Sequence, residues 1–178
     1  MKKMKKIWSV MKRKIIMKVM YFNADLYMKL YTNYLRKEGM QIHGKPNYIS
    51  NDVYFDGKDY SLITLSNNVT ISREVMFLTH DYSMHTVSKD LSLKSEKKIE
   101  IQDKRNNLLI LNEIRIGKNS FIGARTSLLP GTVIGENVLI GACSVVKGEI
   151  PNNSIVVGNP AKIVGNTTEW LERKIQEF

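Results

Sequence analysis

Several residue types are scarce in this 178-residue chain, and each scarcity excludes a class of protein. The single cysteine, Cys143, excludes an intrachain disulfide and a multi-cysteine zinc site, which favours a reducing compartment. Only three histidines are present, so few side chains can act as a base near neutral pH. Hydrophobic residues make up 43% of the sequence and charged residues 25%, as in an ordinary globular domain.

Long apolar runs are also missing from the N-terminal region. The run Ile7–Met11 is followed by basic residues, and the next run, Ile15–Phe22, is interrupted by Lys18. A secretory signal needs about 7–15 apolar residues, and a membrane-spanning helix needs about 20. Neither pattern is present, so we expect a cytoplasmic protein.

Acidic residues are nearly absent from residues 1–45, which hold twelve lysines and arginines but two acids, so the net charge of +10 belongs to this segment. Residues 1–40 are predicted to form a basic amphipathic helical segment. Apolar residues recur there at three- and four-residue spacing: Met4, Trp8, Met11, Ile15, Val19, Phe22, Leu26, Leu30 and Tyr34. We expect this stripe to pack on the body or on a neighbouring subunit. The alternative is peripheral contact of residues 1–38 with the anionic inner membrane surface; no nucleic-acid partner is predicted.

A strict six-residue period occupies the middle of the chain. Its first position is always aliphatic: Ile110, Ile116, Ile122, Leu128, Ile134, Ile140 and Val146. Its fifth position is small or β-branched: Ile114, Ser120, Thr126, Thr132, Val138, Ser144 and Ile150. The same phase appears upstream at Leu65, Ile71 and Phe77, with a weaker hexad from Ile49. Two non-repeating stretches, Phe55–Thr64 and about 82–109, separate these blocks.

A three-sided coil with one short strand and one corner per six residues accounts for this period. Each aliphatic residue would then stack on its copy eighteen residues later, as Ile116 on Ile134 and Ile122 on Ile140. Asn152 stands eighteen residues after Ile134, so we expect the stack to end there. Corners need positive φ, which suits asparagine and glycine at the fourth position: Asn68, Asn119, Gly131 and Asn137.

The expected fold class is therefore an all-β solenoid with a helical segment at each end. We predict a basic helical segment at residues 1–40, a coiled β domain at 41–165 with an insertion at about 82–109, and a short C-terminal helix at 166–178. Thr167 or Thr168 is placed to cap that helix.

The repeats from Ile114 and the ending Gly158-Asn159-Pro160-Ala161-Lys162 resemble the hexapeptide-repeat acetyltransferases, of the maltose, galactoside and surface-polysaccharide sugar type. The resemblance implies a left-handed parallel β-helix and a homotrimer with acetyl-CoA bound between adjacent subunits. It also implies transfer of the acetyl group to a sugar or glycan hydroxyl, without a metal.

The segment Leu78–Ser83 resembles the part of those enzymes that carries a catalytic histidine. By this resemblance His80 is the general base, and Asp81, Tyr82 and His85 contact the acceptor; Asp81 is also a candidate to orient the imidazole. The residues that the resemblance assigns to acetyl-CoA are Gly123, Ala124, Gly141, Ala142, Lys147, Asn159 and Lys162.

Three alternatives remain open at this point. The acceptor can be the amino group of a nucleotide-linked sugar, or serine, in place of a sugar hydroxyl. A metal site of the γ-carbonic-anhydrase kind would use His43, His80 and His85, although the Phe55–Thr64 insertion breaks the register between the first two. The third alternative is a catalytically silent trimeric scaffold.

Overall fold

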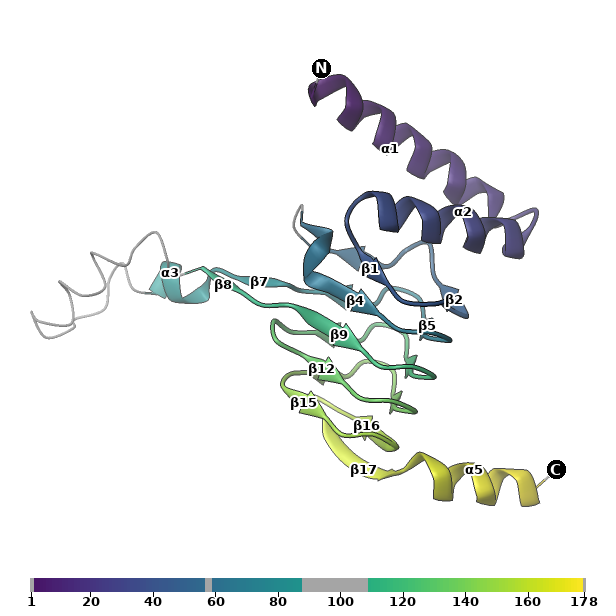
Figure 1. Ribbon diagram of the computed structural model, residues 1–178. Coiled ribbons are helices and arrows are strands. Elements are labelled where there is room, and N and C mark those ends of the chain that lie inside the picture. Colours follow the sequence, from purple (N-terminus) through teal and green to yellow (C-terminus); the bar gives the residue numbers. More distant parts are fainter. Residues whose placement is uncertain (1, 57–58, 88–108, 178) are drawn as a thin grey trace, which may run out of the picture.

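The chain folds into a three-sided coil of short strands with helices at both ends (Figure 1). The computed structural model describes residues 2–56, 59–87 and 109–177, with side chains from residue 8 onward. Helices α1 (Lys2–Val19) and α2 (Ala24–Lys37) lie at the first end of the coil, and α5 (Thr167–Gln176) lies at the other.

Three sheets form the sides of the coil. Sheet A contains β1 (Gln41–Ile42), β4 (Ile63–Leu65), β9 (Ile114–Ile116), β12 (Val133–Ile134) and β15 (Glu149–Ile150). Sheet B contains β2 (Tyr48–Ile49), β5 (Thr70–Ile71), β10 (Phe121–Ile122), β13 (Leu139–Ile140), β16 (Ser154–Val157) and β17 (Lys162–Asn166). Sheet C contains β3 (Tyr54–Phe55), β6 (Met76–Phe77), β11 (Ser127–Leu128) and β14 (Val145–Val146). All pairings in these sheets are parallel except that of β16 with β17.

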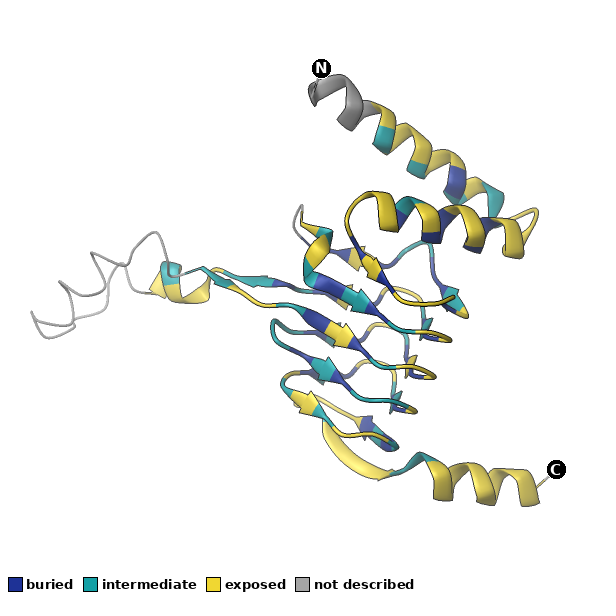
Figure 2. Ribbon diagram, in the orientation of Figure 1, coloured by how far each residue is buried: buried dark blue, intermediate teal, exposed yellow. Residues whose placement is uncertain are grey.

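The stacking predicted from the repeat is confirmed. Ile116 pairs with Ile134 and Ile122 with Ile140, each across eighteen residues. The interior is a set of aliphatic columns (Figure 2), continued toward the N-terminal end by Leu65, Ile71 and Phe77, which are completely buried. Each column removes apolar surface from water along the whole coil, which is the main stabilising term of such a fold.

Two details of the predicted register are wrong. The column above Ile134 continues at Ile150, because the final coil is two residues shorter than the others. Asn152 instead accepts a hydrogen bond from the backbone N–H of Glu136 with its side-chain Oδ1, at 2.8 Å. Ile110 does not line the interior: it is half-buried in β8 (Ile110–Leu111), where it pairs with Asp81 outside the coil.

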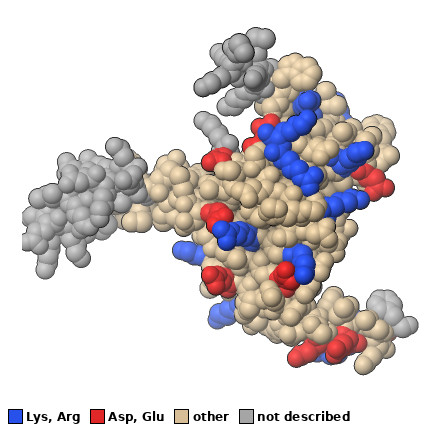
Figure 3. Space-filling view, viewed as in Figure 1, with Lys and Arg blue, Asp and Glu red and all other residues tan. Residues whose placement is uncertain are grey.

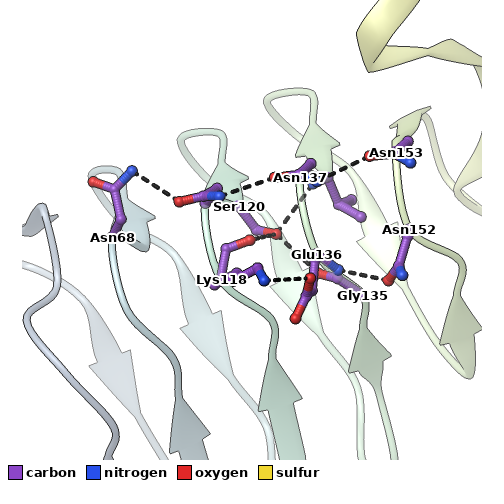
Figure 4. A network of polar contacts seen from close by, with 10 residues as sticks. Asn68, Lys118, Ser120, Gly135, Glu136, Asn137, Asn152 and Asn153 are labelled. Atoms are coloured by element: carbon purple, nitrogen blue, oxygen red, sulfur yellow. Dashed lines mark hydrogen bonds and ion pairs between the residues drawn. The ribbon is translucent and has the colours of Figure 1, made fainter.

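The predicted corner residues have positive φ: 57° at Asn68 and Asn119, 83° at Gly131 and 55° at Asn137. Their asparagine side chains form a ladder along one edge (Figure 4), in which each amide nitrogen donates to the amide oxygen of the next coil. The three hydrogen bonds, from Asn68 through Asn119 and Asn137 to Asn153, measure 3.1, 3.0 and 3.0 Å. At the corner between sheets B and C, Glu74, Arg125 and Cys143 also have positive φ.

The N-terminal segment forms two helices. The expectation that its apolar stripe packs on the body of this chain is wrong. Asn23 interrupts the helical pattern and caps α2, its Oδ1 accepting from the N–H of Leu26 at 2.9 Å. The buried side of α2 is instead Tyr27, Met28, Tyr31, Thr32 and Leu35. The stripe members Trp8, Met11, Ile15, Phe22, Leu26 and Leu30 are exposed. No helix in the described part of the chain is long and apolar enough to cross a bilayer.

A short arm leaves the second coil. It begins with β7 (His80–Asp81), continues with α3 (Ser83–Val87), and returns through β8, which pairs antiparallel with β7. Most of the insertion predicted at about 82–109 falls at 88–108, outside the described residues. At the C-terminal end, Asn166 caps α5 by accepting from the N–H groups of Thr168 and Glu169, so the cap lies just before the threonines expected from the sequence.

Close approach of neighbouring coils makes Gly117 a sensitive position. A Cβ atom there would overlap the backbone carbonyl of Gly135 in the next coil. We expect Gly117→Ala to lower the free energy of unfolding by about 1–3 kcal/mol, as overpacking does elsewhere. Urea denaturation checks this value. Gly165→Ala is the matched control, because an added Cβ there meets only ordinary contacts at 3.7 Å or more; equal stability of the two variants would contradict the expectation.

Candidate functional site

A buried carboxylate holds the histidine that the sequence singles out. His80 lies in β7, and its Nδ1 is 2.8 Å from Oδ2 of Asp56. The Asp56 side chain is only 4% exposed, whereas that of His80 is 29% exposed. The second carboxylate oxygen, Oδ1, accepts hydrogen bonds from the backbone N–H and the hydroxyl of Thr79, both at 2.7 Å. Asp56 is therefore fixed from one side and fixes His80 on the other.

This arrangement selects one form of the imidazole. A carboxylate at Nδ1 is an acceptor, so the neutral ring carries its proton on Nδ1 and keeps a lone pair on Nε2. Tyr82 lies edge-on to the imidazole with ring centroids 5.2 Å apart, which further restricts its rotation. An oriented, partly exposed imidazole with a free Nε2 lone pair is suited to removing a proton from a hydroxyl or amine.

Asp56 was not found from the sequence, which offered Asp81 as the group that orients the imidazole. In the structure Asp81 instead holds the start of α3, where its Oδ1 accepts from the N–H of Ser83 at 2.7 Å. Hydrogen bonds from Ser83 lower the pKa of Asp81. The sequence did contain a signal that could have found Asp56. Phe55 follows Ile49 by six residues and pairs with Phe77, so the residue after Phe55 lies beside the segment that leads to His80.

The other residues predicted on this side of the coil are partly brought together. Tyr82 contacts His80 and is exposed, and His85 is half-buried in α3. Lys147 directly follows β14 and lies two coils along from Leu78 at the same corner of the coil. The hydrogen bonds from Ser83 lower the pKa of Asp81 most, and the charge of Lys147 lowers it further.

A second group of predicted residues lies at the other edge of sheet C, where sheet B turns into sheet C. A shallow cavity of about 330 Å³ is lined there by Arg73, Glu74, Ala124, Arg125, Ala142 and Cys143. Arg125 Nε is 2.8 Å from Oε2 of Glu74. Ala142 is exposed and Ala124 half-buried, so their small side chains leave the edge open.

The adjacent Gly123 and Gly141 are required by packing. A Cβ on Gly123 would lie 2.6 Å from the backbone nitrogen of Ala142, and one on Gly141 would lie 2.6 Å from Cγ1 of Val157. Their absent side chains therefore allow neighbouring coils to approach along the whole edge.

The turn that contains Asn159 extends this second edge by one tier. Gly158 O accepts from the N–H of Val145 at 2.9 Å, and Ala161 N–H donates to Val145 O at 3.0 Å. Asn159 lies within this turn, and Lys162 opens β17 opposite Val157; both are exposed. Ala124, Ala142 and Asn159 thus mark successive coils of one edge.

The two groups lie at opposite edges of sheet C within one chain. His80 follows β6, whereas Ala124 and Ala142 precede β11 and β14. The strands of sheet C separate them. His43 follows β1 at the corner between sheets A and B, so the topology places it at a different edge from His80. Residues 2–56, 59–87 and 109–177 contain no cluster of three or more His, Cys, Asp or Glu side chains that could hold a metal ion.

Comparison with known proteins identifies the type of the six-residue repeat. Residues 113–148 match the family model described as "Bacterial transferase hexapeptide (six repeats)". The chain carries the bacterial transferase hexapeptide repeat.

Parts of the chain are similar to parts of longer curated proteins. A stretch of 49 residues is 49% identical to WbbJ of Escherichia coli (strain K12), provisionally named a lipopolysaccharide biosynthesis O-acetyl transferase. A stretch of 51 residues is 51% identical to a provisionally named acetyltransferase of Staphylococcus aureus (strain COL). These matches cover 28% and 29% of this chain, but only 25% and 26% of the two relatives.

The whole fold is similar to solved hexapeptide-repeat structures. An acetyltransferase of Vibrio cholerae aligns with a TM-score of 0.54 and 18% identity, covering 87% of this chain and 88% of its own. A galactoside acetyltransferase in complex with coenzyme A gives 0.52 and 18%, covering 92% and 83%. A maltose O-acetyltransferase of Clostridium difficile 630 gives 0.52 and 20%, covering 89% and 88%. The fold is a left-handed parallel β-helix, as the resemblance to the hexapeptide-repeat acetyltransferases implied.

Replacing Asp56 by asparagine tests how the imidazole is held. Thr79 donates two hydrogen bonds to Oδ1, so an asparagine would keep its oxygen there and turn its NH₂ toward Nδ1 of His80. We expect Asp56→Asn to move the proton of neutral His80 from Nδ1 to Nε2, observed by NMR of ¹⁵N-histidine-labelled protein. Asp81→Asn is the control and should leave the proton on Nδ1. The same tautomer in wild type and Asp56→Asn would contradict the assignment.

Proposed function

We propose that this protein is an acetyl-CoA-dependent O-acetyltransferase that acetylates a sugar hydroxyl, with His80 as the general base. The observation that carries this proposal is the pair formed by the partly exposed His80 and the buried Asp56. It provides a base with Nε2 available at the surface, close to the point where the repeat opens into the arm. The hexapeptide repeat and the acetyltransferase names of its relatives support the choice of an acetyl donor.

The reaction proceeds by direct attack. Nε2 of His80 takes the proton of the acceptor hydroxyl as its oxygen forms a bond with the acetyl carbonyl carbon. The C–S bond of the thioester then breaks, and the imidazolium returns the proton to the leaving sulfur. Asp56 keeps the ring in the reactive tautomer and stabilises the imidazolium. Asp81 and Tyr82 lie next to this base, and His85 follows in α3. These three residues are our candidates for contacts with the acceptor.

The donor is assigned to the edge marked by Ala124, Ala142 and Asn159. Small side chains there leave room for the extended pantetheine arm, and the closely packed Gly123 and Gly141 keep the edge straight. Backbone N–H groups along such an edge can stabilise the negative charge that develops on the thioester oxygen. The exposed Lys162 beside this edge supplies a positive charge for the phosphates.

A complete site requires a second copy of the chain. His80 and Lys147 lie at one edge of sheet C, and the donor edge lies at the other. We propose a homotrimer in which the His80 edge of one subunit faces the donor edge of the next. A cyclic arrangement makes all three sites equivalent.

Surface-polysaccharide biosynthesis is the process that we assign to the enzyme. The support is the name of the E. coli relative, together with the names of the galactoside and maltose acetyltransferases whose fold this chain shares. Because the imidazole could equally serve an amino group, the acceptors tested should include amino sugars and serine.

Removal of His80 tests the proposed base. With acetyl-CoA and a panel of sugar acceptors, release of free thiol identifies the substrate, and we expect His80→Ala to lower kcat/KM by about 10²–10⁴-fold. His43→Ala is the control, since His43 is exposed at another edge and should leave the rate unchanged. Near-normal transfer by His80→Ala to that acceptor would show that another group is the base.

Mixing two inactive variants tests whether the site is shared. Ala142→Trp should block the donor edge, and His80→Ala should remove the base, so each alone should be inactive. If co-folded subunits combine at random in cyclic trimers, about a quarter of the sites will join an intact base to an intact donor edge. We expect roughly that fraction of wild-type activity. A mixture that remains inactive would place both parts of the site within one subunit.

A further inference from the structure

The outward side of α1 is an apolar strip that nothing in the described part of this chain covers. Trp8, Met11 and Ile15 follow one another at three- and four-residue spacing, which aligns them on one side of the helix. Their exposed fractions are 66%, 57% and 63%. Single exposed apolar residues are ordinary, but three aligned large ones mark a contact surface. We call these three residues the α1 strip.

The strip points away from the rest of the molecule. On the other side of α1, Ile16 is buried and the hydroxyl of Ser9 lies 3.1 Å from that of Tyr34 in α2. At about 100° per residue, Ser9 and Ile16 lie roughly 110–130° around the helix from the middle of the strip. α1 therefore rests on α2 with one side and presents the strip to the surroundings (Figure 2).

The charged residues of α1 itself are all of one sign. Residues 2–19 contain eight lysines and arginines and no acid. Lys12, Lys14 and Lys18 are exposed on the flanks of the strip, and Lys12 Nζ lies 5.5 Å from the centre of the Trp8 ring. On the face seen in Figure 3, Lys and Arg predominate over a few acidic side chains at the end that carries α1 and α2, whereas both signs are more evenly mixed over the coil.

We propose that the α1 strip binds the surface of an anionic lipid bilayer. A helix lying in the headgroup region buries its apolar side, while flanking lysines extend their aliphatic stems and reach lipid phosphates. Positive segments next to a membrane gain further from its negative surface potential. A second copy of α1 is disfavoured as the occupant, because it would bring two unbroken positive helices together. This membrane contact is independent of the acetyl transfer proposed above.

Flotation of the full-length protein with vesicles tests the proposal. We expect it to bind phosphatidylcholine vesicles containing phosphatidylglycerol, to bind pure phosphatidylcholine vesicles at least about tenfold less, and to be released by high salt. The variant Trp8→Ser/Met11→Ser/Ile15→Ser should bind the anionic vesicles at least about tenfold more weakly. Circular dichroism confirms that each variant is folded.

The matched control removes a different exposed apolar group. Trp170, Leu171 and Ile175 of α5 are also exposed, at the far end of the coil. Trp170→Ser/Leu171→Ser/Ile175→Ser should float like wild type. It also leaves Trp8 as the only tryptophan, so a blue shift of its fluorescence on adding anionic vesicles reports entry of the strip into the bilayer.

Three results would overturn the proposal. The first is equal binding of wild type and the α1-strip variant. The second is equal binding to neutral and anionic vesicles. The third is a lower oligomeric mass of the α1-strip variant by light scattering, because the strip would then be an interface between copies of this chain.

Discussion

The corners of the coil are the constraint on which the rest of the structure depends. Each coil must turn between sheets within a few residues, and it does so through left-handed backbone that most side chains disfavour. At the corner between sheets A and B, asparagines occupy this conformation and join their amides along the edge. The cost of the strained backbone is thus offset by hydrogen bonds between coils and by the aliphatic columns inside. Because the interior is filled, binding and chemistry are confined to the edges and to breaks in the repeat.

The repetitive part of this fold could be predicted because every structural requirement recurs in sequence. The repeat has aliphatic residues at the first position, small ones at the fifth and asparagine at several fourth positions. Because each feature recurs several times, the pattern can still be recognised when one repeat departs from it. The exceptions are where the chain departs from six residues per side. The final coil is two residues shorter, so Ile150 pairs with Ile134. No local sequence pattern predicts this shortening.

The candidate site was only half predictable for the same reason. His80 could be selected because the segment around it resembles that of known enzymes. Its partner Asp56 stands at the start of an insertion, where the period is lost. Phe55 still follows the six-residue period and pairs with Phe77, so the next residue, Asp56, lies beside Thr79 and His80. Asp81 was the more visible candidate because it is adjacent in sequence, but the start of α3 engages its carboxylate.

The N-terminal helices show a different limit of pattern analysis. The apolar stripe runs continuously through the sequence, whereas the helix does not, because Asn23 starts a new one. The new helix packs on the coil with a tyrosine-rich side, and the hydroxyl of Tyr27 donates to Ile49 O at 2.8 Å. Tyrosine can pack a ring against the core and pair its hydroxyl at the same time, so a less apolar side becomes the buried one. Periodicity identifies an amphipathic helix, but it does not reveal contacts such as that of Tyr27, which fix the side of α2 that meets the coil. The neighbouring α1 also keeps three large apolar residues exposed, Trp8, Met11 and Ile15, at the end of the coil nearest to His80.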